Sequence, residues 1–478
     1  MSKGTTIATL VLALGVFGTG QVWSEQKPKD DFAWIRGANY VPSYAKNDVA
    51  IWMDFDPAVI DREMGYASRL KLNTVRIFLS VQVYEKNPAL FLERFEQFLA
   101  ICDKHKIRMM PVLFDSCFDP QEVDITEYRD KNWIPSPGFH RLGEKDRPAL
   151  AAYTKTIVSR YKADKRIVIW DIMNEPDITA HYRDWERGGR QTIDAFVRWA
   201  LGYVREQGAT QPLTVGWADA SANIAVIDLV DVISMHTYCG YGELSRRLQE
   251  LQHWGKLHNK PVILSEFVGR PQQPIEQAVP IAVKRKVGWF FWELMLGKTQ
   301  FSQGRRPYQG HLYPDGTCYS AKEVAAILCP EGYTEAPEVV AERAGFRISD
   351  RAPKGFVEEG ISFTSFWERW NGNGPNRGRL WFTAEANETA AKEVEGRRVV
   401  LTLKFGLDCG IVAVTVDGKP AAVATLDTYS AVVDWDRKVV VADNLTPGKH
   451  KVVVTATGRK AAASTHAYIQ LVDIDGHE

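Results

Sequence analysis

Short apolar runs alternate with amphipathic segments from about residue 32 to residue 330. The apolar runs are typical of buried strands, and the segments between them repeat apolar residues at helical spacing. The predicted strands begin near Trp34, Thr74, Met109, Ile167, Leu213, Asp231, Pro261 and Gly288. Eight strands that alternate with helices predict the α/β fold class and, within it, a (β/α)8 TIM barrel.

Helix signals support this pattern. Asp56-Pro57 predicts a helix start, and Ser320-Ala-Lys-Glu323 predicts a capping box that opens the last helix of the barrel. Another helix presents an apolar face formed by Leu92, Phe95, Leu99 and Cys102. The fifth and sixth predicted strands start only about 18 residues apart, so the helix between them must be short. Two long segments, 115–148 and 297–319, follow strands three and eight, on the face where such barrels carry active sites.

The pattern changes after a boundary near residues 330–344, where Pro, Glu and Gly interrupt it. Closely spaced β-rich runs follow, and Asp417-Gly418 is typical of a turn between strands. This series of closely spaced strands predicts a second, all-β domain with a sandwich fold. The predicted organisation is a signal peptide at 1–24, a (β/α)8 barrel at 25–335 and a β-sandwich at 345–478.

The N-terminus has the features of a secretory signal. Lys3 provides a positive start, Ile7 to Phe17 is a short apolar run, and small residues follow at Gly18, Gly20 and Ser24. We therefore expect a secreted or periplasmic protein without a membrane span after removal of the signal; the alternative is a retained N-terminal anchor. The six cysteines have no Cys-x-x-Cys spacing, so a structural zinc site is not indicated, and both disulfides and free thiols are compatible with them.

Composition narrows the range of partners. Lys plus Arg and Asp plus Glu both number 59, and no block of like charge runs along the chain, which argues against nucleic acid or an anionic membrane surface as the main partner. The 15 Trp and 17 Tyr can fill cores, but they can also stack on the apolar faces of sugar rings.

Two glutamates carry the strongest chemical signal. Glu175 follows the apolar run Ile167-Val-Ile-Trp170, within Trp170-Asp-Ile-Met-Asn-Glu-Pro176, and Glu266 follows Val262-Ile-Leu264. They end predicted strands four and seven, which face each other across an eight-stranded barrel. Hydrolysis of a glycosidic bond needs a proton donor and a second carboxylate at the anomeric carbon. Neither motif is specific alone, since each also occurs in surface caps; their joint placement is what indicates a glycosidase.

These residues resemble the clan A glycoside hydrolases, most closely family 5, over residues 32 to about 330. The family ends strand four with Asn-Glu, matching Asn174 and Glu175, and strand seven with a nucleophilic Glu, matching Glu266. An Arg on strand two, His-x-Tyr on strand six and a Trp on strand eight follow in the family's order, at Arg76, His236, Tyr238 and Trp292.

The resemblance implies a role for each residue. Glu175 would be the acid/base, with a pKa raised by the neighbouring carboxylate, and Glu266 the nucleophile, kept ionised by Arg76. Tyr238 would donate to the same carboxylate, Asn174 would bind the sugar 2-hydroxyl, and Trp292 would lie under the sugar. Simpler structural roles stay open: an ion pair for the arginine, a core position for His236, and barrel packing for the tryptophan.

One position departs from the family pattern. Family 5 usually has a His at the end of strand three, where this chain has Asp115 followed by Ser116. Asp115 is therefore a candidate for a hydrogen bond to a sugar hydroxyl. Tyr40, after strand one, and Trp133, in the long loop after strand three, are further candidate sugar contacts. Arg305 and Arg306 could receive an acidic sugar, although an exposed loop explains them as well.

The sequence predicts a retaining glycoside hydrolase that cleaves β-linked glycosides of oligo- or polysaccharides by double displacement, without a metal or organic cofactor. A transglycosylase with the same mechanism and a non-catalytic carbohydrate-binding protein are the alternatives; a purely structural envelope protein would leave the carboxylates unexplained. The C-terminal domain resembles galactose-binding-like jelly-roll modules, and either sugar binding or packing against the barrel would account for it.

Overall fold

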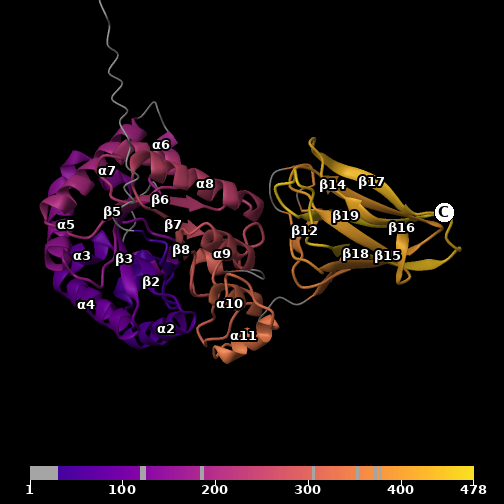
Figure 1. Ribbon diagram of the computed structural model, residues 1–478, viewed down its shortest axis with the longest axis horizontal. Helices are drawn as coiled ribbons and strands as arrows, with labels where there is room; N and C mark the ends of the chain where they lie inside the picture. Colours follow the sequence, from indigo (N-terminus) through magenta and orange to yellow (C-terminus); the bar gives the residue numbers. More distant parts are fainter. Residues whose placement is uncertain are drawn as a thin grey trace, which may run out of the picture.

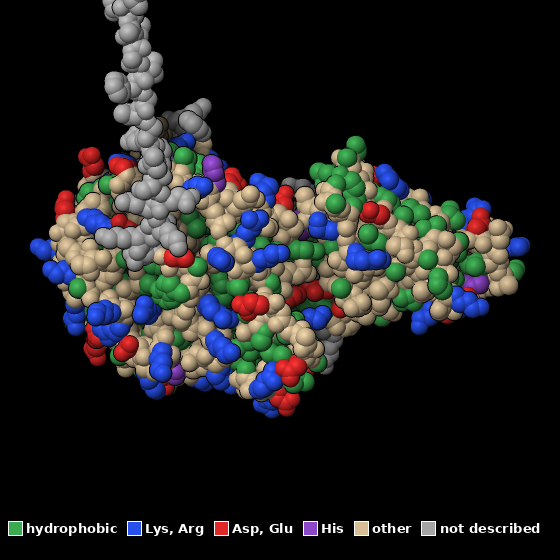
Figure 2. All heavy atoms as spheres, in the orientation of Figure 1, with side chains coloured by type: hydrophobic (Ala, Val, Ile, Leu, Met, Phe, Trp, Pro, Cys, Tyr) green, Lys and Arg blue, Asp and Glu red, His purple; other side chains and the backbone are tan. Residues whose placement is uncertain are grey.

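The computed structural model describes residues 31–118, 125–183, 188–303, 307–350, 355–370, 374–376 and 378–478. The predicted signal peptide and the Arg305-Arg306 pair lie outside these ranges. Figure 1 shows two units side by side: strands ringed by helices in the N-terminal part, and strands alone in the C-terminal part. On the face shown in Figure 2, basic and acidic side chains are interspersed over the barrel, as the balanced composition predicts.

Eight parallel strands form one sheet in the order β5-β4-β3-β2-β1-β8-β7-β6, which confirms the predicted barrel. The strands are β1 (Arg36–Asn39), β2 (Thr74–Phe78), β3 (Arg108–Asp115), β4 (Trp170–Asn174), β5 (Leu213–Gly216), β6 (Ile233–Thr237), β7 (Val262–Phe267) and β8 (Gly288–Phe291). Each begins within three residues of its predicted start. Most strand residues are buried, because the barrel interior covers one face and the helices cover the other.

The barrel closes between β5 and β6 through few hydrogen bonds. The amides of Asp231 and Val232 donate to the carbonyl of Leu213 at 2.9 and 3.2 Å, and the amide of His236 donates to that of Trp217 at 2.7 Å. Only a 3-10 turn, η4 (Ala220–Val226), connects the two strands, as the short interval predicted.

Helices surround the barrel. They are α1 (Asp48–Met53), α2 (Pro57–Arg69), α3 (Val81–Lys86), α4 (Pro88–Lys104), α5 (Arg147–Tyr161), α6 (Ala180–Arg183), α7 (Gly189–Glu206), α8 (Tyr241–His258), α9 (Ile275–Lys284), α10 (Ala321–Leu328) and α11 (Pro337–Arg343). Short 3-10 turns are η1 (Ile125–Asp130), η2 (Phe139–Arg141), η3 (Glu144–Asp146) and η5 (Gln300–Ser302). Asp56 caps α2 as predicted, accepting from the amides of Ala58 and Val59.

The predicted capping box at α10 is only half correct. Ser320 caps the helix by accepting from the amide of Lys322 at 3.2 Å. Glu323 does not turn back to the cap; its carboxylate binds the buried guanidinium of Arg270 and Nδ1 of His311. A buried cation outcompetes a partly solvated backbone amide for this carboxylate, because charge-assisted hydrogen bonds are the stronger ones.

The hydrophobic core of the barrel continues beyond residue 335. Val340 and Ala341 of α11, together with Phe346, belong to the same cluster of buried side chains as the barrel strands. The guanidinium of Arg69 in α2 lies 4.4 Å from the centroid of the Phe346 ring and donates to the carbonyl of Gly345. The chain thus stays on the barrel through residue 346.

The C-terminal part contains two antiparallel sheets, in the orders β16-β15-β18-β13-β10-β9 and β11-β12-β19-β14-β17, as predicted for a sandwich. The strands are β9 (Phe356–Glu358), β10 (Ile361–Phe363), β11 (Glu368–Arg369), β12 (Trp381–Thr383), β13 (Thr389–Glu395), β14 (Arg398–Phe405), β15 (Ile411–Val416), β16 (Lys419–Asp427), β17 (Asp434–Ala442), β18 (Lys449–Ala456) and β19 (Ile469–His477). Asp417 and Gly418, both at positive φ, form the predicted turn between β15 and β16. The resemblance to galactose-binding modules stays a prediction.

Two further observations concern the whole described chain. All six cysteines lie in described segments, and each is a free thiol there. None of the described helices combines the length and the hydropathy that a membrane span requires.

Close strand packing in the barrel generates a stability prediction. A Cβ added at Gly37 of β1 would lie 2.4 Å from Cδ1 of Phe290 on β8. We expect Gly37→Ala to destabilise the protein by about 1–3 kcal/mol, since overpacking forces buried neighbours to move. The matched control is Gly202→Ala in α7, where a Cβ meets nothing within 4 Å and helix propensity favours alanine. Thermal unfolding should show a lower midpoint only for the first variant; equal midpoints for both would contradict the barrel packing.

Candidate active site

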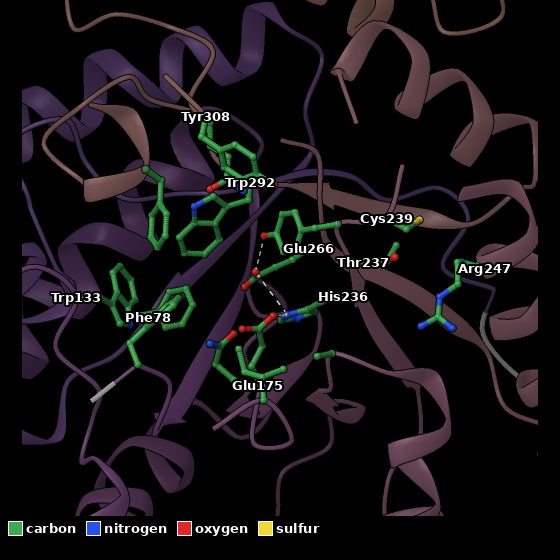
Figure 3. A pocket seen from close by; sticks show the side chains of 17 residues that line it. Phe78, Trp133, Glu175, His236, Thr237, Cys239, Arg247, Glu266, Trp292 and Tyr308 are labelled. Atoms are coloured by element: carbon green, nitrogen blue, oxygen red, sulfur yellow. Dashed lines mark hydrogen bonds and ion pairs between the residues drawn. The ribbon is translucent and has the colours of Figure 1, made fainter. Parts of the chain in front are cut away.

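A cavity of about 470 Å³ opens at the carboxyl ends of the barrel strands. Phe78, Asn174 and Thr237, which line it, are the last residues of β2, β4 and β6. The full lining is Phe78, Phe118, Trp133, Asn174, Glu175, Ile178, Ala218, His236, Thr237, Tyr238, Cys239, Arg247, Glu266, Trp292, Phe301, Tyr308 and Gln309. Figure 3 shows Glu175, Glu266 and His236 at the centre of the labelled side chains.

Glu175 and Glu266 project into this cavity from β4 and β7. One carboxylate oxygen of each and a ring nitrogen of His236 all lie within 4.8 Å of one another. The backbone of Glu175 is in the left-handed region, at φ 39°, and its amide donates to the carbonyl of Gly216 at 2.7 Å. Such strained backbone persists only where its surroundings hold it, and here it directs the glutamate into the cavity.

Arg76 lies beneath the two glutamates and is fully buried. Its Nη1 donates to Asn39 Oδ1 at 2.9 Å and to Glu266 Oε1, and its Nε donates to Asp171 Oδ2 at 2.9 Å. Its Nη2 donates to Asn174 Oδ1 at 2.8 Å. One guanidinium thus connects β1, β2, β4 and β7. Arg76 does not line the cavity, so it positions the site instead of contacting a ligand.

Glu266 is held from two sides. Arg76 contacts Oε1, and the hydroxyl of Tyr238 donates to Oε2 at 2.8 Å. Burial raises the pKa of Glu266 above its ordinary value, whereas the charge of Arg76 and the hydrogen bond from Tyr238 act in the opposite direction. Both contacts were predicted, and both favour the ionised carboxylate that a nucleophile requires.

Glu175 has a different environment. Burial raises its pKa to about 7, while the Cys117 thiol, 3.5 Å from Oε2, and the charge of Arg76 lower it. Repulsion from Glu266 was the predicted cause, but desolvation is the main one. Glu175 is therefore largely protonated at mildly acidic pH, as a proton donor must be.

His236 lies between the two carboxylates. Its Nδ1 is 2.9 Å from Glu175 Oε1 and 3.5 Å from Glu266 Oε2. Burial lowers the pKa of His236 to about 4, so the imidazole is neutral near neutral pH. Its Nε2 is buried and has no hydrogen-bond partner among the described residues.

Asp115 and Trp133 form a pair at the edge of the cavity. The indole Nε1 of Trp133 donates to Asp115 Oδ2 at 2.7 Å, and the amide of Cys117 donates to Oδ1 at 2.8 Å. Asp115 is buried and is not part of the lining, so it orients the indole instead of offering a free oxygen to a sugar. Trp133 itself lines the cavity, as predicted.

Tyr40 does not line the cavity. It is fully buried, and its hydroxyl donates to Glu63 Oε2 at 2.8 Å. Glu63 is also bound by the amide and hydroxyl of Ser43. Placement after β1 suggested a sugar contact, but a buried carboxylate on α2 turns the side chain into the core. We do not retain Tyr40 as a site residue.

Several aromatic residues of the lining were not predicted. Phe78 and Trp133 meet edge to face at 4.8 Å, and the Trp292 ring lies 5.7 Å from Phe78 and 5.8 Å from Trp133. Phe78 ends the motif Val75-Arg-Ile-Phe78, so its position at a strand end was a usable signal. Phe118 and Phe301 lie in long loops, where sequence spacing gives no direction to a side chain.

The Glu175–His236–Glu266 group is compact enough to hold a metal ion. The charge distribution disfavours one, since Glu266 already accepts from a guanidinium and a phenol and a second cation would face the charge of Arg76. The donor set thus favours proton chemistry between two carboxylates.

Comparison with known proteins places the chain in a family. Residues 58–296, half of the chain, match "Cellulase (glycosyl hydrolase family 5)". The chain belongs to glycosyl hydrolase family 5. Comparison with curated protein sequences finds no match.

Solved family 5 structures resemble the fold at low identity. The exo-β-1,4-mannosidase Op5Man5 from Opitutaceae bacterium strain TAV5 is 18% identical, with a TM-score of 0.49 over 67% of this chain and 62% of that one. A lichenase from Caldicellulosiruptor is 15% identical, with a TM-score of 0.46 over 68% and 98%. The endo-1,4-β-mannanase from Rhizomucor miehei is 14% identical, with a TM-score of 0.43 over 61% and 96%. This chain thus spans less than two thirds of the mannosidase.

The contact between Cys117 and Glu175 generates a prediction. The thiol favours the ionised carboxylate, so Cys117→Ala should raise the pKa of Glu175 above about 7. The measurement is a carbon-13 NMR titration of protein labelled at the glutamate carboxyls, with Glu175→Gln to identify the resonance. The control is Cys102→Ala, at a buried thiol on α4 away from the cavity. An unchanged or lower pKa in Cys117→Ala would show that the thiol does not act on Glu175.

Proposed function

We propose that the protein is a retaining β-glycosidase that hydrolyses β-linked oligo- or polysaccharides, with Glu175 as acid/base and Glu266 as nucleophile. The observation that carries this proposal is the approach of the two carboxylates, whose oxygens come within 4.8 Å. Retaining enzymes hold their carboxyl groups about 5–5.5 Å apart, whereas inverting enzymes need about 6.5–9.5 Å to admit a water. Family membership supports the same reaction class.

In the first step, an oxygen of Glu266 attacks the anomeric carbon while the bond to the leaving oxygen breaks. Glu175 donates its proton to that oxygen, which departs as an alcohol. In the second step, Glu175 removes a proton from water, the water oxygen attacks the same carbon, and Glu266 leaves as a carboxylate. Configuration at the anomeric carbon is retained because it inverts twice.

Charge coupling allows Glu175 to serve both steps. Glu175 and Glu266 repel one another when both are ionised, and this repulsion contributes to the raised pKa of Glu266. Esterification of Glu266 removes its charge, so the pKa of Glu175 falls in the intermediate. Glu175 then releases its proton more readily and can act as base towards water.

The same intermediate is compatible with transfer to a sugar acceptor instead of water. Hydrolysis and transglycosylation differ only in the second step, and product analysis at increasing acceptor concentration separates them. The signal-like N-terminus supports export, and we propose that the enzyme acts outside the cytoplasm on external glycans.

Trapping of the intermediate tests the assignment. A panel of aryl 2-deoxy-2-fluoro-β-glycosides should add the mass of one fluorosugar to the protein, on the peptide that contains Glu266. Glu266→Gln should remain unlabelled and inactive. Glu175→Ala should form the covalent intermediate only from substrates with good leaving groups. Added azide should restore its turnover, and the product should be a β-glycosyl azide. Full activity of Glu266→Gln, with no label from any sugar, would refute the proposal.

The hydrogen bond from Tyr238 to Glu266 generates a pH prediction. Its loss in Tyr238→Phe raises the pKa of Glu266, so the acidic limb of kcat/KM should move to higher pH. Activity at the optimum should fall about tenfold, because a hydrogen bond to a charged group is worth at least about 1.5 kcal/mol. The alkaline limb, set by Glu175, should move little. The control is Tyr203→Phe on α7, and an acidic limb that moves to lower pH would be inconsistent with this role.

A further inference from the structure

The two catalytic glutamates divide the cavity into halves of different character. Figure 3 shows Phe78, Trp133 and Trp292 on one side of Glu175 and Glu266, and Thr237, Cys239 and Arg247 on the other. The first half lies over β8, β1, β2 and β3, and the second lies over β5 and β6. We call them the aromatic half and the open half.

The aromatic half suits the sugar whose bond is broken. Its three rings, Phe78, Trp133 and Trp292, lie 4.8–5.8 Å apart between centroids and pack edge to face against one another, so they form one continuous aromatic surface beside the carboxylates. Positive charge develops on that sugar in the transition state, and aromatic faces attract cations. Asn174 adds a polar contact here, because its amide lies between Arg76 on β2 and Asp115 on β3.

The outer end of the aromatic half is closed by two loops that meet. The loop after β3 supplies Phe118, and the loop after β8 supplies Phe301, whose ring lies 5.9 Å from Phe118 and 5.7 Å from Trp292. The amide of Trp133 donates to Gln300 Oε1 at 3.2 Å, which adds a polar contact between the same loops. Since β1 and β2 lie between β8 and β3, these contacts cross the rim of the barrel.

The loop after β1 fixes this closure from outside. Asn47 Nδ2 donates to three carbonyls of the β3 loop, those of Tyr128, Lys131 and Asn132. A Cβ at Gly297, in the β8 loop, would lie 2.7 Å from Cα of Ser43, so the two backbones are in close contact. Three loops therefore meet around the aromatic half, in the direction in which a longer glycan would have to continue.

The described lining after β6 contains one ring, that of Tyr238, and no cluster of rings comparable to that of the aromatic half. Small side chains, Ala218, Thr237 and Cys239, line it next to the carboxylates. Arg247 lies farther out, where its guanidinium is already paired with Asp219 and Glu250. This half therefore has fewer large rings beside the carboxylates than the aromatic half.

From this asymmetry we infer that the enzyme is exo-acting and releases one sugar at a time from the non-reducing end of a β-linked glycan. The terminal sugar occupies the aromatic half, and the remaining chain extends over β5 and β6 as the leaving group. The inference rests on the proposed function and specifies which bond is cleaved. The residues that set the mode of action are Phe118, Phe301 and Gln300, which touch neither glutamate.

The test uses β-1,4-linked manno- and gluco-oligosaccharides with a fluorophore at the reducing end. Chromatography of early time points should show free monosaccharide and labelled products shorter by one unit. Oligosaccharides that carry a bulky substituent on the non-reducing terminal sugar should react at least about 100-fold more slowly, because the closed end cannot admit the group. Internal cleavage at the earliest times, or equal rates on blocked chains, would overturn the inference.

Variants separate this inference from the proposed function. Phe118→Ala combined with Phe301→Ala should open the wall, so that blocked chains are cleaved and products longer than a monosaccharide are released. Trp34→Ala, at an exposed ring before β1 on the opposite end of the barrel, is the matched control and should remain exo-acting. Thermal unfolding confirms that each variant folds. Labelling of Glu266 with internal cleavage refutes only the exo inference, whereas absence of labelling refutes the proposed function.

Discussion

The buried guanidinium of Arg76 is the interaction on which the site depends. Burial of an unpaired cation would cost several kcal/mol, and the protein meets this cost with the carboxylates of Asp171 and Glu266 and the amides of Asn39 and Asn174. These partners come from three strands, β1, β4 and β7, so the charge can be satisfied only when the barrel is closed. The fold and the position of the Glu266 carboxylate are therefore determined together.

The same arrangement separates the acidities of the two glutamates. Glu266 accepts directly from Arg76 and Tyr238, so its charged form is stabilised despite burial. Glu175 receives only a thiol and an imidazole contact, and desolvation raises its pKa to about 7. The two glutamates thus lie side by side with different hydrogen-bond partners, and the partners of Glu266 favour its ionised form.

Features that depend on local pattern could be predicted from the sequence. The strands, the Asp56 cap and the Asp417-Gly418 turn follow from residues near in the chain, and the strand ends bring Glu175 and Glu266 together. Predictions failed where a distant partner decided the outcome. Glu323 binds Arg270 instead of its own helix cap, because a charge 53 residues away is a stronger partner.

The long loops were recognised as important, but their contacts could not be predicted. Phe118 and Phe301 are 183 residues apart and belong to segments without periodicity, so nothing in their spacing indicates that the rings meet. Tyr40 was misplaced for a related reason, since its orientation depends on Glu63 in the next helix. The two glutamates lie at strand ends, which the pattern predicts, whereas Phe118 and Phe301 lie in loops, whose contacts the pattern does not predict.

The C-terminal sandwich contacts the segment of the barrel that follows β6 and bounds the open half. The chain that leaves β6 carries Tyr238 and Cys239 and continues into α8, where a Cβ at Gly240 would collide with the ring of His466. Tyr241 also meets His466 edge to face at 6.4 Å, and the barrel side with α8 and α9 faces the sandwich in Figure 1. The sandwich thus supports the backbone that bounds the open half. The aromatic half is fixed by loops within the barrel, and the open half is fixed by contact between the two units.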